Sequence, residues 1–566
     1  MLKKCAVIFM ALILSAMSLT ACSDNTSTTT NTTSSISSQV SQDNASTASQ
    51  SSNFSDSDYK DITSETENAV ITLSGNEGTI SDTTRGSSGS EVTITSKGIY
   101  KVTGSSENVT IKINDSTKSG NIYLVLDNVS MTNTSNACIY VEACDKLIVQ
   151  CTGNSFLTYN NSDSNSKIDG AIYSKDDVTI NGNGSLDINS SLHGIVCKED
   201  MKITGATLNI NSDNIGIQAN DSLRIDGGTT SIQSDHDSIQ LENDDNTSYF
   251  CMESGSLTVN AGYDGISLKS ADSSKAFNGS VKITGGTVNI TSGGGSDNSK
   301  NSSTSQKGIK CDGEIDIENS AVTISSADDA IHGKDNITIN SGTLSLSSSD
   351  DGITATGIVT INSGDITISK SYEGIEGGSV VINSGNVSVT SSDDGINTSG
   401  GSDTTAQDDS LWSEDSNGNI NIAGGNIYIN SSGDGLDSNG SIYVTGGTTI
   451  IEGAVTDNNG AIDKGDGENC VASITGGTVL ALGTPDMAVN FDTGTQCSAL
   501  VNISGSKDTV ISVDDGSDFT FTATKDFSCA VYSSPKLTQG NNYTLTAGSD
   551  TAQIDFSSGL YYTDVK

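Results

Sequence analysis

The chain has 566 residues, of which 70 are Asp or Glu and 27 are Lys or Arg, so its formal net charge is −43 at pH 7. It contains no basic run that could follow a phosphate backbone, which excludes nucleic acid as a partner. Hydrophobic residues make up 33% of the chain and fall mainly in short alternating segments. A long, repetitive β structure would bury such segments better than a spherical core would.

The first residues are typical of an export signal. Two lysines precede an apolar run from Ala6 to Leu19, which is too short to span a bilayer and has the length of a signal-peptide core. The string that ends at Cys22 resembles the bacterial lipobox, whose cysteine receives lipid after cleavage. We therefore expect residues 1–21 to be a signal peptide and Cys22 to be lipidated. An ordinary signal peptide followed by a chance cysteine is the alternative.

A polar linker follows the expected lipid anchor. Residues 22–58 are almost entirely Ser, Thr, Asn and Gln, a composition that favours a flexible tether over a packed fold. The rest of the chain has no second apolar stretch long enough to cross a bilayer. We therefore expect a protein that contacts the membrane only through its lipid, on the extracellular face of a bacterial cell membrane.

An internal repeat occupies residues 131–500. The commonest step between equivalent aliphatic residues is 22, and longer steps contain polar insertions at about 293–306 and 399–418. Each unit has three short segments of alternating hydrophobicity, separated by turns rich in Gly, Asn or Asp. The aligned residues are Ile139, Ile172, Ile195, Ile217, Ile239, Ile266, Ile309, Ile331, Ile353, Ile375, Ile396, Leu436 and Ile462.

This pattern predicts an all-β protein, a parallel β-helix of about 14 rungs of about 22 residues each. Leucine-rich repeats have a similar length, but their Leu and Asn/Cys signature is missing. Stacking would place equivalent residues about 4.8 Å apart, so Asn340, Asn362 and Asn383 should form a ladder of side-chain amides. Residues 59–130 and 501–566 alternate without the repeat, which predicts an N-terminal and a C-terminal β cap over the open sheet edges.

The turns before the repeat isoleucines are acidic in the later rungs. Stacked carboxylates repel one another by about 1 kcal/mol or more each, and Ca²⁺, which takes six to eight oxygen ligands, would remove that repulsion. Turn formation alone would explain one Asp in each unit but not the Asp doublets. We therefore expect bound calcium. The candidate ligands are Asp350, Asp351, Glu373, Glu376, Asp393, Asp394, Asp434 and Asp437.

Few residues suggest catalysis. The three histidines have no zinc-site spacing, and His332 should be exposed on an outward-facing position. A lyase acting on uronic acid polymers would need a calcium ion and a basic residue that takes the C5 proton. Lys310 and Lys334 are the lysines beside the acidic turns and are the candidates for that base. A solvent-exposed structural lysine is the commoner outcome, so whether the chain is an enzyme stays open.

Several strings resemble one family. Residues 371–377 read Ser-Tyr-Glu-Gly-Ile-Glu-Gly and are flanked by Asp-Asp-Gly-Ile strings at 350–353 and 393–396; residues 124–129 and 432–440 agree with the same pattern. They resemble the bacterial carbohydrate-binding β-helix family of cell-surface proteins. The resemblance implies a right-handed parallel β-helix related to the pectate-lyase superfamily, bound calcium, and binding of cellulose and pectic polymers.

One rung departs from the family pattern. Ala330 and His332 stand where a Gly and an Asp or Asn are typical, which weakens the expectation of a metal at the rung of Ile331.

Two aromatic residues are candidates for stacking on sugar rings: Tyr372, and Trp412 in the second insertion. Trp412 could equally pack against the rod.

We therefore expect a surface-anchored lipoprotein that binds cellulose, polygalacturonate-like polymers or both, and that depends on calcium. Because the chain is strongly acidic, an acidic polymer would need a cation between itself and the protein. A calcium-dependent pectate lyase and a purely structural adhesin or stalk are the alternatives.

Overall fold

The computed structural model describes residues 53–163, 165–398, 418–456, 459–485, 487–559 and 562–565. Most of the expected export signal and tether, the lipidation candidate Cys22 and the sugar-stacking candidate Trp412 lie outside these ranges. Phe54–Lys566 forms one compact unit, and among its described residues a single helical turn, α1 (Asp56–Tyr59), accompanies the strands. The predicted all-β class is confirmed. In the described ranges, no helix has both the length and the apolar character needed to cross a bilayer.

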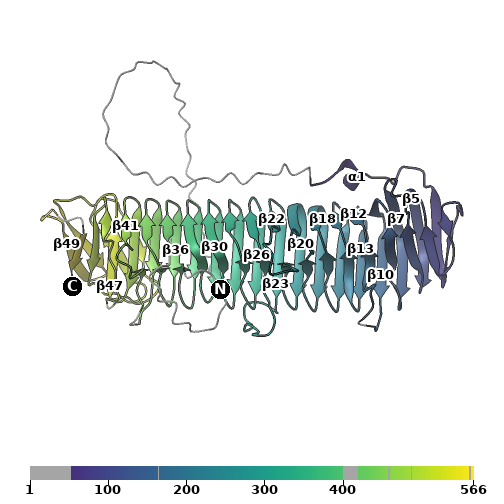
Figure 1. Ribbon diagram of the computed structural model, residues 1–566. Helices are drawn as coiled ribbons and strands as arrows, with labels where there is room; N and C mark the ends of the chain where they lie inside the picture. The colour runs from purple at the N-terminus through teal and green to yellow at the C-terminus, as the bar shows by residue number, and fades with distance from the viewer. Residues whose placement is uncertain are drawn as a thin grey trace, which may run out of the picture. The chain divides into compact units, whose positions relative to one another are not determined.

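Most strands of this unit form one large, mainly parallel assembly (Figure 1). They lie in three columns, and each strand pairs in parallel with its equivalents in the preceding and the following repeat. The first column carries the candidate site. It consists of β4 (Glu91–Ile94), β6 (Thr110–Asn114), β8 (Ile139–Ala143), β11 (Gly170–Ser174), β14 (His193–Cys197), β17 (Ile217–Ala219), β19 (Ile239–Leu241), β21 (Ile266–Leu268), β24 (Ile309–Cys311), β27 (Ile331–Gly333), β30 (Ile353–Ile361), β32 (Ile375–Ile382), β34 (Ile396–Asn397), β37 (Leu436–Ser438) and β40 (Ile462–Lys464).

The second and third columns complete each repeat, and the longest strands run from one column into the next. The second column consists of β5 (Gly98–Glu107), β7 (Ile122–Asn133), β9 (Lys146–Cys151), β12 (Asp177–Gly182), β15 (Asp200–Ile203), β18 (Ser222–Ser234), β20 (Tyr249–Ala261), β22 (Ser280–Ile283), β25 (Glu314–Ile317), β28 (Ile337–Ile339), the later parts of β30 and β32, β35 (Ile420–Ile422), β38 (Ile442–Val444), β41 (Ala472–Ile474) and β43 (Thr493–Gly494). The third consists of the later parts of β7, β18 and β20 with β10 (Asn154–Tyr159), β13 (Ser185–Ser190), β16 (Thr207–Ser212), β23 (Thr287–Ser292), β26 (Ala321–Ser326), β29 (Thr343–Ser348), β31 (Asp365–Lys370), β33 (Asn386–Thr390), β36 (Asn426–Asn430), β39 (Thr448–Glu452) and β42 (Thr478–Gly483).

The register of the first column confirms the sequence alignment. Ile331 pairs with Ile309 on one side and with Ile353 on the other, and the same pairing links the aligned aliphatic residues from Ile139 to Ile462. These side chains are at most 1% exposed and belong to one continuous core. Burial of each contributes about 1.5–3 kcal/mol, so the repeat is held together mainly by this aliphatic stack.

The expected asparagine ladder is also confirmed. The Asn362 side-chain amide donates to Asn340 Oδ1 at 2.7 Å, and Asn383 donates to Asn362 Oδ1 at 2.8 Å. Each side-chain amide thus forms a hydrogen bond with the equivalent amide of the next repeat, and these bonds help to fix the register of successive turns.

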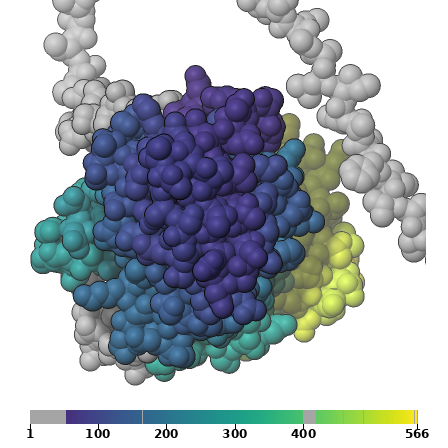
Figure 2. All heavy atoms as spheres, turned by 90° about the vertical axis from the view of Figure 1, so that its right-hand side faces the viewer, coloured from purple at the N-terminus to yellow at the C-terminus, as the bar shows by residue number. Residues whose placement is uncertain are grey.

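Antiparallel pairs occur only near the two ends of the described assembly. At the first end, β1 (Ala69–Gly75) pairs antiparallel with β2 (Glu77–Ile80), and β3 (Gly86–Ser87) with β4; atoms of these early residues fill the face seen in Figure 2. At the other end, β47 (Cys529–Ser533) pairs antiparallel with β42 and β44 (Ser498–Val501), and β50 (Tyr562–Val565) pairs parallel with β44. A separate antiparallel sheet of β46 (Thr520–Thr522), β45 (Val510–Val513), β48 (Asn542–Ala547) and β49 (Asp550–Asp555) shares a second, smaller core with residues of β42, β44 and β47.

Candidate functional site

The acidic turns of successive repeats form a line of stacked side chains beside the first strand column. We call the position two residues before each repeat aliphatic the acidic column. Its carboxylates accept a hydrogen bond from the backbone N–H of the same position in the next repeat: Asp434 N–H donates to Asp394 Oδ1 at 2.7 Å, and Glu373 N–H to Asp351 Oδ1 at 3.1 Å. The carboxylates therefore stabilise the turns as well as carrying charge. From the Ile239 to the Leu436 repeat the column reads Asp237, Asp264, Lys307, Asp329, Asp351, Glu373, Asp394 and Asp434.

The residue between this column and the repeat aliphatic is usually glycine, because there is no room for a side chain. A Cβ added to Gly395 would lie 2.2 Å from Ile429 Cγ2 and 2.6 Å from the carbonyl oxygen of Gly435. Packing therefore requires a glycine in the Asp-Gly-Ile string. With glycine there, the carboxylate lies at the turn and the isoleucine lies in the core.

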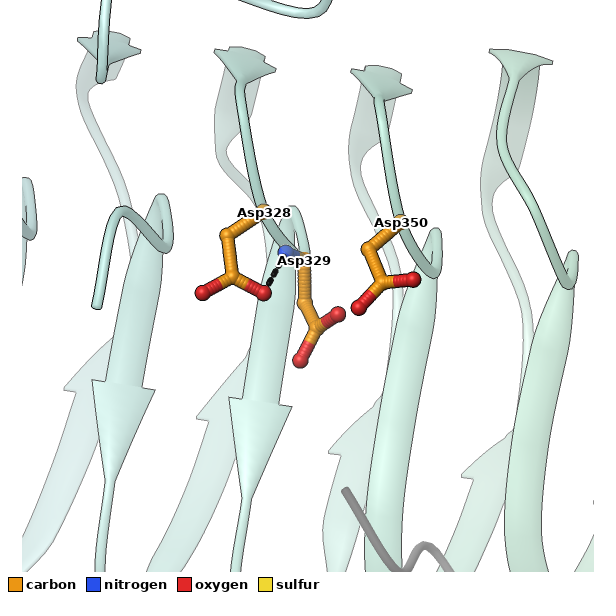
Figure 3. Close-up of side chains that lie close together, drawn as sticks. All are labelled: Asp328, Asp329 and Asp350. Atoms are coloured by element: carbon orange, nitrogen blue, oxygen red, sulfur yellow. Dashed lines mark hydrogen bonds between the residues drawn. The ribbon is translucent and has the colours of Figure 1, made fainter. Parts of the chain in front are cut away.

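The first cluster consists of Asp328, Asp329 and Asp350, whose carboxylate oxygens approach within 4.8 Å of one another (Figure 3). Lys307 Nζ lies 3.0 Å from Asp328 Oδ1 and donates to Asp329 Oδ2, and Lys300 contacts both Asp328 and Asp350. This cluster therefore contains its own cations, whose two ammonium groups already offset most of the charge that a metal ion would compensate.

The charge state of Asp329 follows from these partners. Its side chain is fully buried, and burial alone would raise the pKa of its carboxyl group. The adjacent Lys307 charge and the hydrogen bond with His332 outweigh burial, so that the pKa of Asp329 lies below its usual value. Asp329 is thus an ionised carboxylate held between the Lys307 ammonium and the His332 ring.

The expectation that His332 is exposed was wrong. The residue is 5% exposed, and its Nδ1 lies 2.9 Å from Asp329 Oδ2. The insertion at 293–306, which joins β23 to β24, covers this position, and an alignment of repeats gives no information about where an insertion lies. Lys307 could have been identified from the sequence, because it stands at the acidic position of the Ile309 repeat. Lys300, within the insertion, has no such signal.

The second cluster consists of Asp394, Asp434 and Asp437, again with carboxylate oxygens within 4.8 Å of one another. In the part of the chain that the structure describes, none of the three forms an ion pair with Lys or Arg. Burial, followed by repulsion from neighbouring carboxylates, raises the pKa of each to about 7. These carboxyl groups cannot all ionise without a compensating positive charge, and their hard oxygen donors fit Ca²⁺.

A third acidic group lies between the two clusters. Thr354 Oγ1 donates to Asp351 Oδ2 at 3.0 Å and to Glu376 Oε2 at 3.3 Å, and Asn397 Nδ2 donates to Glu373 Oε2 at 3.0 Å. Burial and the adjacent carboxylates raise the pKa of Glu373 to about 10 and that of Asp351 well above its usual value. In the second cluster the oxygens of three carboxylates lie within 4.8 Å of one another, which makes that cluster the better candidate for a cation.

Of the remaining predicted residues, Asp393 adjoins the second cluster, and its carboxylate helps to raise the pKa of Asp394, Asp434 and Asp437, whereas the two candidate lysines lie apart from it. Asp393 accepts a hydrogen bond from the Tyr372 hydroxyl, which with burial raises the pKa of that hydroxyl; the Tyr372 side chain is 47% exposed. Lys310 and Lys334 belong to the Ile309 and Ile331 repeats, at least three repeats before Asp394, or about 14 Å at the usual strand spacing. The structure therefore does not bring either candidate base to the candidate calcium ligands.

Comparison with known proteins identifies the family. Residues 88–352 and 348–516 match the family model described as "Carbohydrate-binding domain-containing protein". Because these segments cover most of the chain, the chain belongs to the family of carbohydrate-binding domain-containing proteins.

Two individual proteins are similar to parts of the chain. A carbohydrate-binding domain-containing protein of Acetivibrio thermocellus is 35% identical over 127 residues, which are 21% of this chain and 44% of that protein, so the chain spans less than half the length of this relative. A solved structure of the polysaccharide lyase-like protein from C. thermocellum, a gadolinium derivative, is 26% identical with a TM-score of 0.34 and covers 53% of this chain and 100% of its own.

Proposed function

We propose that this protein binds polysaccharides and that Asp394, Asp434 and Asp437 hold a calcium ion on its acidic face. The observation that carries the proposal is the difference between two clusters of the same residue type. The first is neutralised by Lys300 and Lys307, whereas the second has raised carboxyl pKa values and no lysine or arginine partner among the described residues. Membership of a carbohydrate-binding family supports the choice of ligand.

The chain's own residues would prepare this face for an acidic polymer. Asp394 and Asp434 are fixed by backbone N–H groups of the following repeats, so their oxygens are positioned before any ligand arrives. When bound, Ca²⁺ supplies open coordination positions for sugar carboxylates and hydroxyls. Tyr372, on the turn one repeat before Asp394, would offer an exposed ring to a pyranose face. Cellulose and polygalacturonate-like polymers are the proposed ligands.

We also propose that the three strand columns form a right-handed parallel β-helix of about 14 rungs with a β cap at each end. The uniform parallel register and the 22-residue step support this architecture. The apolar leader and the lipobox-like string support a lipoprotein held on the extracellular face of a bacterial membrane through Cys22.

Retention on insoluble polymers tests the function. We expect the protein to be retained on cellulose and on polygalacturonate in calcium buffer, with chelation lowering retention on polygalacturonate by about tenfold or more, equivalent to at least about 1.4 kcal/mol. The Asp394→Asn/Asp437→Asn variant should behave like chelated protein. Asp213→Asn/Asp235→Asn, which removes two exposed turn carboxylates from earlier repeats, is the matched control. Failure of both polymers to retain the protein in calcium buffer would refute the proposal.

A further inference from the structure

A cleft of about 640 Å³ opens beside the first cluster, between the strands β24 and β27 and the insertion that precedes β24. Its volume lies within the range of small-molecule sites. The wall formed by the insertion presents Asn and Ser/Thr side chains with Lys300, whereas the floor presents Lys307, Lys310, His332 and Lys334. The carboxylates of Asp328 and Asp350 also line the cleft, and they are paired with Lys300 and Lys307. Amides, hydroxyls and ammonium groups on facing walls suit a ligand that has both hydroxyl groups and a negative charge.

The insertion is held in place over several repeats. Ser296 N–H donates to Ser325 Oγ at 3.0 Å, Gln306 Nε2 donates to the Gly262 carbonyl at 3.2 Å, and Lys300 joins Asp328 to Asp350. These contacts reach the repeats on both sides of β24. The insertion that forms the wall of the cleft is therefore held in a defined position.

Two lysines of the floor keep hydrogen-bonding capacity for a ligand. Lys310 Nζ donates to Ser305 Oγ at 3.1 Å and lies 3.6 Å from Asp264 Oδ2, and Lys334 Nζ lies 2.8 Å from Asp312 Oδ1 with its side chain 56% exposed. An ammonium group has three N–H donors, so each lysine has donors beyond these partners. The carboxylates of Asp264 and Asp312 are nearly buried, whereas the lysines are more exposed, so an incoming carboxylate can reach each ammonium from the solvent side.

Two further polar atoms at the cleft have no hydrogen-bond partner among the described residues. His332 uses Nδ1 to contact Asp329, and the structure records no partner for its Nε2 among the described residues, although the side chain lines the cleft. Thr304 Oγ1, in the wall, is buried without a hydrogen-bond partner. A buried hydroxyl without a partner is unfavourable by about 1–3 kcal/mol, and a ligand hydroxyl would recover this when the Thr304 side chain turns its oxygen toward the cleft.

We propose that this cleft is a metal-independent binding site for a carboxylated sugar residue, whose carboxylate is held by Lys310 and Lys334 and whose hydroxyls bond His332 and the wall. The inference rests on the proposed polysaccharide-binding function and adds a second site to it. The first cluster serves this site structurally, because its buried carboxylates fix Lys300, Lys307 and His332 around the cleft. An acidic polymer would thus be bound at two places by different means, by lysines here and through calcium at the second cluster.

Calorimetric titration of the full chain with trigalacturonate in a chelating buffer tests the site. We expect binding that weakens at least tenfold in Lys310→Met/Lys334→Met, survives in Lys310→Arg/Lys334→Arg, and weakens at least tenfold when the trisaccharide is methyl-esterified. The control is Lys175→Met/Lys198→Met, which removes two lysines at the same strand position as Lys334 in distant repeats and should bind like the wild type. Unchanged circular dichroism and melting would show that the variants are folded.

The outcomes separate this inference from the proposed function. Absence of binding in the chelating buffer, or equal binding by the wild type and Lys310→Met/Lys334→Met, would overturn the inference. If the wild type is then still retained on polygalacturonate in calcium buffer, the proposed function stands and only the lysine site is wrong. If retention fails as well, both are wrong.

Discussion

Replacing Asp394 and Asp437 by Asn removes the charges that burial and mutual repulsion make unfavourable in the second cluster. In the folded chain the pKa of each carboxyl is about 7, against an ordinary value of 3.8. The folded chain therefore keeps protons on these carboxyl groups that the unfolded chain releases above about pH 4. Without calcium, the free energy of unfolding falls as pH rises from about 4 to about 7 and then levels off. A shift of about three pKa units corresponds to about 4 kcal/mol for one carboxyl, and the interaction between the groups makes this an upper bound for each.

The expected change in melting temperature follows from the size of the unit. With an unfolding entropy of about 2.1 cal/mol/K for each of roughly 500 residues, 4 kcal/mol corresponds to about 4 °C if Phe54–Lys566 melts cooperatively. Because the variant removes two carboxyls, the wild type in a chelating buffer should lose up to about 8 °C more than Asp394→Asn/Asp437→Asn between pH 4 and pH 7. Calcium should remove part of the difference, since a ligand at 100 times its Kd adds about 2.7 kcal/mol.

Melting curves by circular dichroism at several pH values, with calcium and with chelator, measure both effects. The Asp213→Asn/Asp235→Asn variant controls for the general loss of negative charge. Parallel pH profiles for the wild type and Asp394→Asn/Asp437→Asn in chelator, together with no stabilisation by calcium, would refute the reasoning about the second cluster.

Three further changes have defined outcomes. Lys307→Met leaves Asp329 buried without its main cation, so the melting temperature should fall, by an amount equivalent to about 3–5 kcal/mol, and calcium should restore part of it; a melt unaffected by calcium would contradict this. Ile353→Ala opens a cavity in the aliphatic stack and should cost about 2–5 kcal/mol by chemical denaturation while leaving calcium affinity, measured by titration, unchanged. Cys22→Ser should move the protein from the membrane fraction to the medium of the expressing bacterium, and continued membrane retention would rule out the lipid anchor.

The parts of the fold that depend on local spacing could be predicted from the sequence. Ile331 pairs with Ile309 and Ile353 as aligned, and the Asn362 ladder follows, because a parallel stack places residues of equal phase above one another. The same spacing correctly indicated where acidic side chains gather. It could not indicate which of them keep their charge, because that depends on side chains from other repeats and from an insertion. His332 was misplaced for this reason.

Charge compensation divides the acidic column into two parts, and this division follows from a single substitution in the repeat pattern. In the Ile309 repeat the acidic position holds Lys307, and its ammonium supplies to Asp328 and Asp329 the positive charge that an ion would otherwise supply. Asp394 and Asp434 occupy the same position in later repeats, where no lysine replaces a carboxylate. In the proposed calcium site, a cation that enters from solvent would compensate this uninterrupted run of carboxylates. The position at which lysine replaces the carboxylate is also where the cleft opens, so the same repeat geometry can serve a bound metal in one place and a charged sugar in another.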